Sequence, residues 1–411
     1  MREVSIDKKR MISNFFSLSI LQFLNLVLPL ITVPYVVRVI GIEKFGLVNY
    51  ALSIIMYFTI LVNFGLDLSV TPKIAINRDN SKFVSELFSV VMTIKIVLIL
   101  LSFVTLLIAL HLVPSLKKNF LLFFLTFGFV IGNGMLPSWF YQGMEKMKYL
   151  TMVNSSSRIF FTVLMLIMLK SKEDFILVAM FNSLGAIVGG VLAFFLVFKL
   201  FNVTFIMPKL NRIKNEIKES FHFFLSRIAY NGSRYLGTTI IGSFFGNTLV
   251  GYYSIVEKLF YAFLSLGEVI FQTIYPYMSR TRNIVFFKKL LLVVILISIS
   301  ILFPLMYYNQ ILLDVLFDIN NKVLSDLFVI VFVGAIFGIV HALLGYSLLG
   351  AFGYRKEANN SLIYSSTIYI ISVFIGAFIF KDIYIVAFSI VIYHLSAFIF
   401  RTYYTIKYKL L

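Results

Sequence analysis

The sequence contains no cysteine, which excludes disulfides, a thiol nucleophile and a cysteine-ligated metal. Charged residues are scarce, at 13% of 411 residues. No phosphate-binding loop of the G-x-x-x-x-G-K-[ST] kind occurs, so we expect no ATP hydrolysis by this chain. No cleavable signal peptide is evident, because the first apolar run is too long for one and no small-residue cleavage site follows it. We therefore expect no metal, no cofactor and no catalytic residue.

Apolar residues dominate what is present. They make up 60% of the chain, and the mean hydropathy is +0.96. A soluble protein of this length cannot bury so much apolar surface, so lipid must be the solvent for most of the chain. A membrane span needs about 20 apolar residues. Twelve such runs lie near residues 13–38, 45–66, 87–110, 119–141, 149–169, 175–199, 221–245, 248–278, 288–307, 324–350, 359–380 and 383–404.

Lysine and arginine are distributed unequally between the two sides of these spans. Of the 36 basic residues, 23 fall at the termini and in the loops of one side, seven in loops of the other side, and six within spans. The positive-inside rule then predicts cytoplasmic termini in a multi-pass membrane protein. The isoelectric point of 9.8 reflects this topology, and no nucleic-acid partner is expected.

The two halves of the chain resemble each other weakly. VIGIEKFGLVNYALSI at 39–54 aligns with FFGNTLVGYYSIVEKL at 244–259, which places Gly41 on Gly246 and Gly46 on Gly251. The Gly-basic hairpins at 139–149 and 347–357 also correspond. This pattern predicts an all-α membrane protein with a parallel 6+6 repeat, which is typical of transporters that hold cargo in a central cavity between the halves. The predicted parts are an N-terminal lobe at 1–200, a cytoplasmic linker at 201–220 and a C-terminal lobe at 221–411.

The seventh span carries two arginines. Arg227, Asn231, Arg234 and Thr238 follow helical spacing and share one face. The eighth span has a polar face of its own, which includes Glu257 and Glu268, with Lys258 next to Glu257. We expect the two stripes to face each other or a shared water-filled cavity. The polar-face residues of the eighth span are Tyr253, Glu257, Tyr261, Ser265, Glu268 and Gln272.

Two explanations of these charges remain open. The carboxylates could neutralise the arginines and only join helices. Alternatively, the cations could bind an anionic ligand, because they outnumber the two glutamates of the spans, Glu257 and Glu268, and unpaired charge in a membrane needs water or a ligand. Arginine suits phosphate or carboxylate through its paired donors. The six cations within spans are Arg38, Lys95, Arg158, Arg227, Arg234 and Lys258.

Other polar residues within spans are weaker candidates. Arg38 could snorkel to the outer interface, while Lys95 and Arg158 lie in cytoplasmic halves of their spans. Asp67 is either a proton or sodium site, as Glu257 and Glu268 also could be, or a helix-end residue. His341 is alone in its span, as His394 is in another span, and a lone histidine is more often a packing residue than a protonation site.

Three segments carry a family resemblance. The pattern P-Y-x-x-R-x-x-G-x-x-x-F-G and the hairpin WFYQGMEKMKY resemble the Wzx-type flippases, in the polysaccharide transport branch of the multidrug/oligosaccharidyl-lipid/polysaccharide (MOP) exporter superfamily. The stretch NFGLDLSVTPKIAINRDNSK adds to the resemblance. The C-terminal half matches mainly in hydropathy. The matching residues are Pro34, Tyr35, Arg38, Gly41, Phe45, Gly46, Trp139, Gln142, Gly143, Glu145, Met147 and Tyr149.

The resemblance implies translocation of undecaprenyl-pyrophosphate-linked O-antigen repeat units from the cytoplasmic to the outer leaflet of the cell inner membrane. It also implies alternating access, coupling to an ion, and work beside a polymerase and a chain-length regulator. Arg38, Arg227, Asn231, Arg234 and Lys258 would bind the cargo. Lys95, Arg158 and His341 are further cavity candidates, and membrane lipid is the surrounding partner.

Charge in the spans and the length of the outer loops distinguish the alternative functions. A drug or cation antiporter of the superfamily would favour acidic spans, whereas this chain is cationic. A lipid II flippase would carry the same pyrophosphate. A membrane polymerase usually has a large outer loop, which is missing here. An acyltransferase needs a base, and neither His341 nor His394 has a carboxylate at helical spacing.

Overall fold

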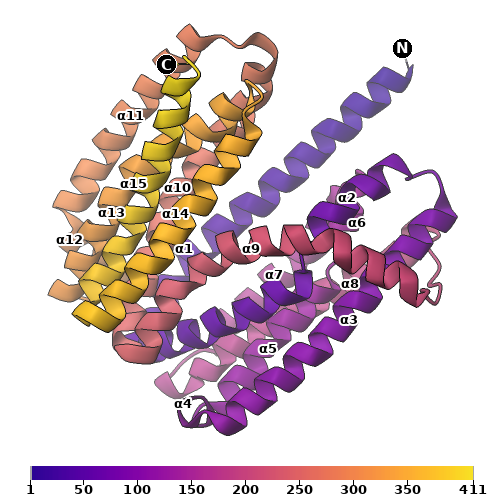
Figure 1. Ribbon diagram of the computed structural model, residues 1–411. Helices are drawn as coiled ribbons and strands as arrows, with labels where there is room; N and C mark the ends of the chain where they lie inside the picture. The colour runs from indigo at the N-terminus through magenta and orange to yellow at the C-terminus, as the bar shows by residue number, and fades with distance from the viewer. Residues whose placement is uncertain (1, 411) are drawn as a thin grey trace. The chain divides into compact units, whose positions relative to one another are not determined.

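Helices make up most of the part of the chain that the structure describes (Figure 1). A computed structural model describes residues 2–410, apart from the side chains of residues 2–19, 21, 22, 25, 226, 229, 230, 266, 268, 269, 272 and 273. The helical form follows from the apolar runs, because a helix satisfies its backbone hydrogen bonds internally where no water is present.

The helices have the following bounds. The first part contains α1 (Arg2–Asn63), α2 (Leu66–Ile76), α3 (Ser81–Leu112), α4 (Pro114–Lys117), α5 (Phe120–Met135), α6 (Ser138–Gly143), α7 (Met147–Met168), η1 (Lys172–Asp174) and α8 (Phe175–Phe201). The second contains α9 (Leu210–Phe244), α10 (Asn247–Thr281), α11 (Ile284–Tyr307), α12 (Asn309–Phe317), α13 (Lys322–Ala342), η2 (Leu343–Gly350), α14 (Arg355–Phe374), η3 (Ile375–Phe380) and α15 (Ile383–Lys407).

Each of the twelve predicted spans corresponds to a helix or to one arm of a bent helix. Within the described residues, nine helical stretches are long and apolar enough to cross a membrane. The remaining predicted spans correspond to the first arm of α1, to α9 and to α10. The two arms of α1 meet at Gly41, where the backbone leaves the helical region (φ 78°, ψ 163°). Each of these three stretches contains side chains that lie outside the described residues.

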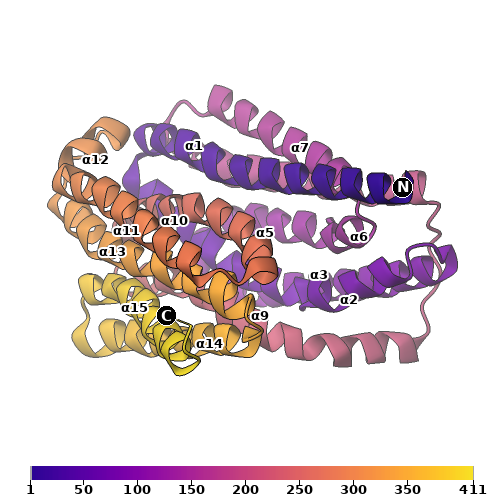
Figure 2. The ribbon, with the colours of Figure 1, turned by 90° about the horizontal axis from the view of Figure 1, so that it is seen from above.

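The chain divides into two compact units. Unit 1 comprises Met1–Leu28 and Ala51–Tyr235, and unit 2 comprises Pro29–Tyr50 and Leu236–Leu411. In unit 1, α5 and α7 both pack against α8, and in unit 2, α13 and α14 both pack against α15 (Figures 1 and 2). The lobe boundary predicted at 201–220 stays a prediction.

Each unit has its own apolar core. In unit 1, the buried ring of Phe88 lies 5.9 Å from that of Trp139 and 5.5 Å from that of Phe140. In unit 2, the rings of Tyr354 and Tyr408 stack at 3.8 Å beside buried leucines of η2. Small residues allow close helix contact, because a Cβ atom on Gly132 of α5 would collide with the backbone carbonyl of α8 at residue 186. Such contacts are common between membrane helices, where dispersion replaces the hydrophobic effect.

The paired glycines of the predicted repeat adopt matching conformations in unit 2. Gly41 and Gly246 both have positive φ (78° and 91°) with ψ of 163° and 168°. Gly46 and Gly251 then bring α1 and α10 together, because a Cβ on Gly46 would meet the backbone carbonyl of Asn247, and a Cβ on Gly251 would likewise meet a carbonyl of α1. The structure therefore confirms the parallel repeat in backbone geometry as well as in sequence.

The two Gly-basic hairpins also share one geometry. After α6, the Lys146 N–H donates to the Tyr141 carbonyl (2.9 Å) around Glu145, which has φ 56°. After η2, the Tyr354 N–H donates to the Leu349 carbonyl (2.8 Å) around residue 353, a glycine with φ 97°. Both turns end a helix with a left-handed residue at the equivalent place and with the same backward hydrogen bond.

Candidate functional site

Helices α2 and α9 meet along a line of side chains in unit 1, which we call the α2–α9 seam. It begins where Gly65 starts α2 with φ 68°. A Cβ on Gly65 would collide with the backbone of Phe223 and Phe224, so glycine permits close approach. Beside it, the rings of Phe64 and Phe224 stack at 4.7 Å.

The centre of the seam is an ion pair between two predicted site residues. Nη2 of Arg227 donates to Oδ2 of Asp67 at 2.8 Å. The two side chains are 34% and 38% exposed, so both remain reachable from outside the unit. Five residues further along α9, the Gly232 carbonyl accepts a hydrogen bond from the hydroxyl of Tyr57 of α1 at 3.2 Å. The sequence predicted Arg227 and Asp67 separately, and only the fold pairs them.

A second cation, Lys95, interacts electrostatically with the Asp67 carboxylate of this pair. Lys95 of α3 is 2% exposed, and its ammonium donates to the Asn63 side-chain carbonyl at 3.1 Å. The Asp67 carboxylate acts electrostatically on Lys95 as well. Two cations thus share one carboxylate, and Arg227, Asp67 and Lys95 together carry one net positive charge. A half-exposed guanidinium with further N–H donors in such a field is suited to a phosphate or a carboxylate.

A polar clasp closes the far end of the seam. Lys73 of α2 donates to both carboxylate oxygens of Glu216 (2.9 and 2.7 Å) and to Glu219 (2.7 Å). Ser69 donates to Glu216 at 3.1 Å and lies 2.7 Å from the Ser220 hydroxyl. Glu216 is 6% exposed, and these donors compensate for the burial of its charge. The clasp holds the start of α9 on α2.

The polar stripe of α9 continues into unit 2. Asn231 is half-buried and Arg234 is exposed. Four residues beyond Arg234, the Thr238 hydroxyl donates to Oε2 of Glu257 at 3.1 Å. The stripes of α9 and α10 therefore contact each other at this point. Lys258 is half-buried next to Glu257.

The other predicted residues lie elsewhere. Arg38 donates to a backbone carbonyl in the last turn of α12, within unit 2. Arg158 is half-buried on α7, where Gly185 of α8 approaches its backbone. The side chain of Glu268 lies outside the described residues. His341 is buried in unit 2 and hydrogen-bonds to His394.

Arg401 is a buried residue that the sequence interpretation missed. Loop counting places it among the cytoplasmic cations of the C-terminus, yet it is 3% exposed and contacts His341. The available signal was its spacing on α15, seven residues after His394, which puts both side chains on one helix face.

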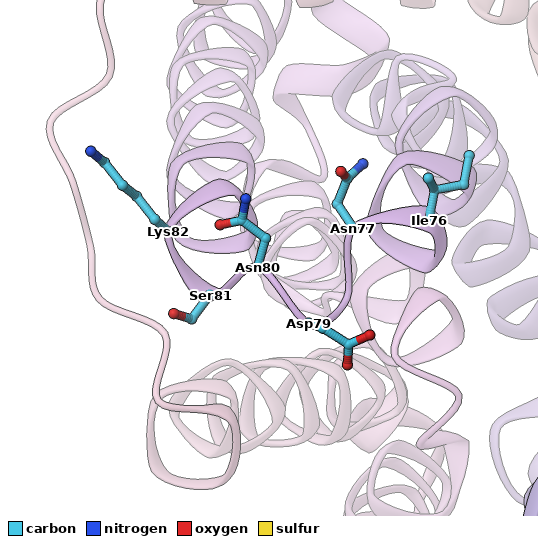
Figure 3. A pocket seen from close by; sticks show the side chains of 6 residues that line it. All are labelled: Ile76, Asn77, Asp79, Asn80, Ser81 and Lys82. Carbon is cyan, nitrogen blue, oxygen red and sulfur yellow. The ribbon is translucent and has the colours of Figure 1, made fainter. Parts of the chain in front are cut away.

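An open polar hollow lies at the turn between α2 and α3 (Figure 3). The Asn80 side chain there accepts a hydrogen bond from the Phe83 N–H at 3.1 Å and so caps α3. The side chains of Asp79 and Lys82 diverge (Figure 3). The hollow is explained by capping and turn chemistry, and we assign it no ligand. Its lining residues are Ile76, Asn77, Asp79, Asn80, Ser81 and Lys82.

Metal binding finds no support in the part of the chain that the structure describes, where no three His, Asp or Glu side chains gather. The cluster of Arg227, Lys95 and Asp67 offers two cations and one carboxylate, which favours an anionic ligand over a metal ion.

Known proteins resemble this chain in sequence over most of its length. The profile of a family described as "Polysaccharide biosynthesis protein" matches residues 11–282. The chain is 26% identical to a "Putative O-antigen transporter" of Escherichia coli (strain K12) over 393 residues, 92% of this chain and 93% of the relative. A relative of the same name from Shigella dysenteriae is 26% identical over 67% of this chain and 69% of its own length.

Two solved structures have a similar fold over most of this chain. The fold of "Lipid II flippase MurJ, inward closed conformation" matches 96% of this chain and 87% of its own, with a TM-score of 0.71 and 17% identity. A multidrug resistance transporter of the MATE family and MOP superfamily, in an inward-facing conformation, matches 93% of this chain and 94% of its own, with a TM-score of 0.62 and 14% identity. At these identities the likeness concerns the fold alone.

Proposed function

Because the chain belongs to the polysaccharide biosynthesis protein family, we propose that it is a flippase for lipid-linked O-antigen repeat units. The cargo is an oligosaccharide on undecaprenyl pyrophosphate, which the protein carries from the cytoplasmic to the outer leaflet of the inner membrane by alternating access. The E. coli relative described as an O-antigen transporter, which aligns over nearly its whole length, supports the cargo class.

The observation that carries the proposal is the net positive cluster of Arg227, Asp67 and Lys95. A pyrophosphate is the charged part of the proposed cargo, and a half-exposed guanidinium can bind it through several N–H donors. A half-exposed ion pair is worth only about 0–1 kcal/mol. A pyrophosphate with more than one negative charge can therefore replace Asp67 as the partner of Arg227.

When the cargo pyrophosphate binds Arg227, the Asp67 carboxylate would be released from its ion pair with Arg227. Once displaced, the Asp67 carboxylate can turn toward the buried Lys95 ammonium or take up a proton. Asp67 would thereby be the ion-coupling residue, with Glu257 and Glu268 of α10 as further candidates. Asn231 and Arg234 continue the same face of α9 and would contact the sugar or its phosphates. The cations that would add to the positive field around the cargo are Lys258, Arg38, Lys95 and Arg158. His341 is a further candidate residue of the cavity.

The test is complementation of a bacterium that lacks its own O-antigen flippase. Arg227→Ala and Arg234→Ala are expected to reduce O-antigen ladders about tenfold or more, because a charged hydrogen bond is worth about 1.5–3 kcal/mol. Arg227→Lys keeps the charge without the paired donors and should be intermediate. Ladders are measured on gels, and membrane levels of each variant by immunoblot.

Arg212→Ala is the matched control on the same helix. Its side chain is 65% exposed and lies 3.9 Å from Glu86, so full ladders are expected. Normal ladders from Arg227→Ala and Arg234→Ala would contradict the proposed binding of an anion by these arginines. Rescue of a strain depleted of its lipid II flippase, without rescue of O-antigen, would instead assign lipid II as cargo. A polymerase and a chain-length regulator are the proposed partners on the outer face.

A further inference from the structure

Three buried side chains of unit 2 form a continuous hydrogen-bonded chain. His341 of α13 is 7% exposed, and His394 and Arg401 of α15 are 4% and 3% exposed. Nη1 of Arg401 lies 3.1 Å from Nδ1 of His341, and Nε2 of His341 lies 2.9 Å from Nδ1 of His394. The two imidazole rings stack at 5.2 Å with an angle of 27°. This network lies outside the α2–α9 seam.

The chemistry of arginine fixes where the protons of this network lie. A guanidinium only donates hydrogen bonds, so Nδ1 of His341 must accept. The proton of His341 then lies on Nε2 and is donated to Nδ1 of His394. Both basic ring lone pairs are therefore occupied by donors, one from Arg401 and one from His341. A proton can be added to this pair only by breaking one of the two hydrogen bonds.

A break in the helix allows Arg401 to reach His341. Helix α13 continues into η2, and Gly345 leaves the helical region there (ψ −110°). A regular helix would pair the His341 carbonyl with the Gly345 N–H. Here the His341 carbonyl accepts from Nη1 of Arg401 at 2.5 Å. A Cβ on Gly345 would collide with that guanidinium. The histidine pair is thus joined to a kink, a common place for helices to bend.

The surroundings of the pair come from neighbouring helices. From α14, Ser361 accepts from Nε of Arg401 at 3.0 Å and Ala358 accepts from Nη2 at 3.2 Å. From α10, the Phe260 ring lies 5.2 Å from that of His394. The side chain of Glu268 on α10 lies outside the described residues. The titratable groups nearby are Arg401, the phenols Tyr393 of α15 and Tyr369 of α14, and Glu257 one turn before Phe260.

We propose that His341 and His394 form a proton-binding site, and that binding a proton separates α13 from α15 at the Gly345 kink. The structure holds the proton-free arrangement. A second donor between the rings, close to the Arg401 cation, cannot coexist with the present contacts, so protonated and unprotonated protein must adopt different arrangements. The proposal deepens the proposed function by naming the proton as coupling ion, and it rests on that function only for the link to cargo.

The titration can be measured without cargo. The chain has four histidines, so nitrogen-15 spectra of the full-length protein in lipid bilayers can be assigned with single variants. Between about pH 8 and about pH 5, either side of the ordinary histidine pKa of about 6.5, we expect the signals of this pair to gain one proton and the coupling across the inter-ring hydrogen bond to vanish. Two rings that stay neutral and coupled down to about pH 5 would overturn the proposal.

Matched variants separate this site from the other histidines. His394→Gln should abolish the titration of the pair, whereas His111→Gln, at an exposed position, should leave it unchanged. His341→Gln serves where His394→Gln fails to fold, since glutamine can also donate and accept. Loss of the titration in His111→Gln would contradict the assignment to the buried pair.

Transport supplies the second readout. In the complementing strain, collapse of the pH gradient should reduce O-antigen delivery by the unaltered chain and by His111→Gln. Delivery by His394→Gln should be low and insensitive to the gradient. A His394→Gln chain that keeps full, gradient-dependent delivery would overturn the coupling role. No delivery by the unaltered chain would refute the proposed function and leave the spectroscopic result standing.

Discussion

At the scale of single residues, Lys95 shows how a buried charge is balanced in the α2–α9 seam. Its ammonium is almost completely buried, and its hydrogen-bond acceptor, Asn63, is neutral. The Asp67 carboxylate, which balances it, is already bonded to Arg227. An isolated buried ammonium is costly, so a shared carboxylate leaves the cluster short of negative charge. An anionic cargo would supply it.

The shared charge predicts that substitutions at Asp67 and Lys95 have coupled effects on stability, which a double-mutant cycle measures. Asp67→Asn should lower the free energy of unfolding by about 1–2 kcal/mol, a value reduced because Asp67 and Arg227 are about a third exposed. Adding Lys95→Met should restore most of the loss, since it removes the buried charge that the neutral amide of the Asp67→Asn variant no longer balances. Thermal unfolding in detergent measures both variants.

Lys95→Met alone is the necessary control for that cycle. If Asp67→Asn is equally destabilising with and without Lys95→Met, the two residues are uncoupled and the cluster does not share charge.

At the scale of elements, two helices pass from one compact unit into the other. The first turns of helix α9 are bound to α2 by the ion pair between Glu216 and Lys73. The residues of α9 from Leu236 onward belong to unit 2. Helix α1 contributes Pro29–Tyr50 to unit 2 and its remaining residues to unit 1. The glycines at which α1 bends and α10 begins have left-handed φ, a region that costs other residues strain.

Alanine at the two repeat glycines tests this geometry. Gly41→Ala and Gly246→Ala should each cost about 1–3 kcal/mol, because both have φ and ψ values that are nearly exclusive to glycine. Both should lower the melting temperature of the purified protein by a similar amount. Gly185→Ala is the control within a helix, where the nearest atom to a new Cβ is 3.5 Å away; it should be neutral or stabilising. Unequal losses at Gly41 and Gly246 would argue against equivalent roles.

At the scale of the whole molecule, lipid exposure and charge asymmetry define the protein. Rows of large apolar side chains are exposed on α3 and α11, such as Leu100, Val104 and Ile108, which only a membrane tolerates over such lengths. The basic residues concentrate in the predicted loops of one side, a bias that predicts cytoplasmic termini.

The absence of cysteine makes this orientation testable. Single cysteines in place of Lys118 and Lys381, both exposed, should react with a membrane-impermeant maleimide in intact cells. Cysteines in place of Lys209 and Lys407, also exposed, should react only after the cells are opened. The unaltered chain gives the blank, because it has no thiol. Labelling of Lys407→Cys in intact cells would reverse the predicted topology.

The sequence by itself determined the helices, because apolar runs of span length, glycines and charge bias are local properties. Each predicted span corresponds to an observed helix or helix arm, and Gly41 and Gly246, paired by alignment alone, share one backbone conformation. Those residues act through their own backbone or through lipid, so their neighbours in space need not be known.

Only the tertiary structure decided which polar side chains meet. Arg227 and Asp67 are separated by 160 residues and form an ion pair, while His341 and His394, each alone in its span, bond to each other and His341 contacts Arg401. Helical spacing fixes the face that a residue occupies, but it does not say which helix packs against that face. That choice follows from packing, such as the close approach that Gly65 allows between α2 and α9.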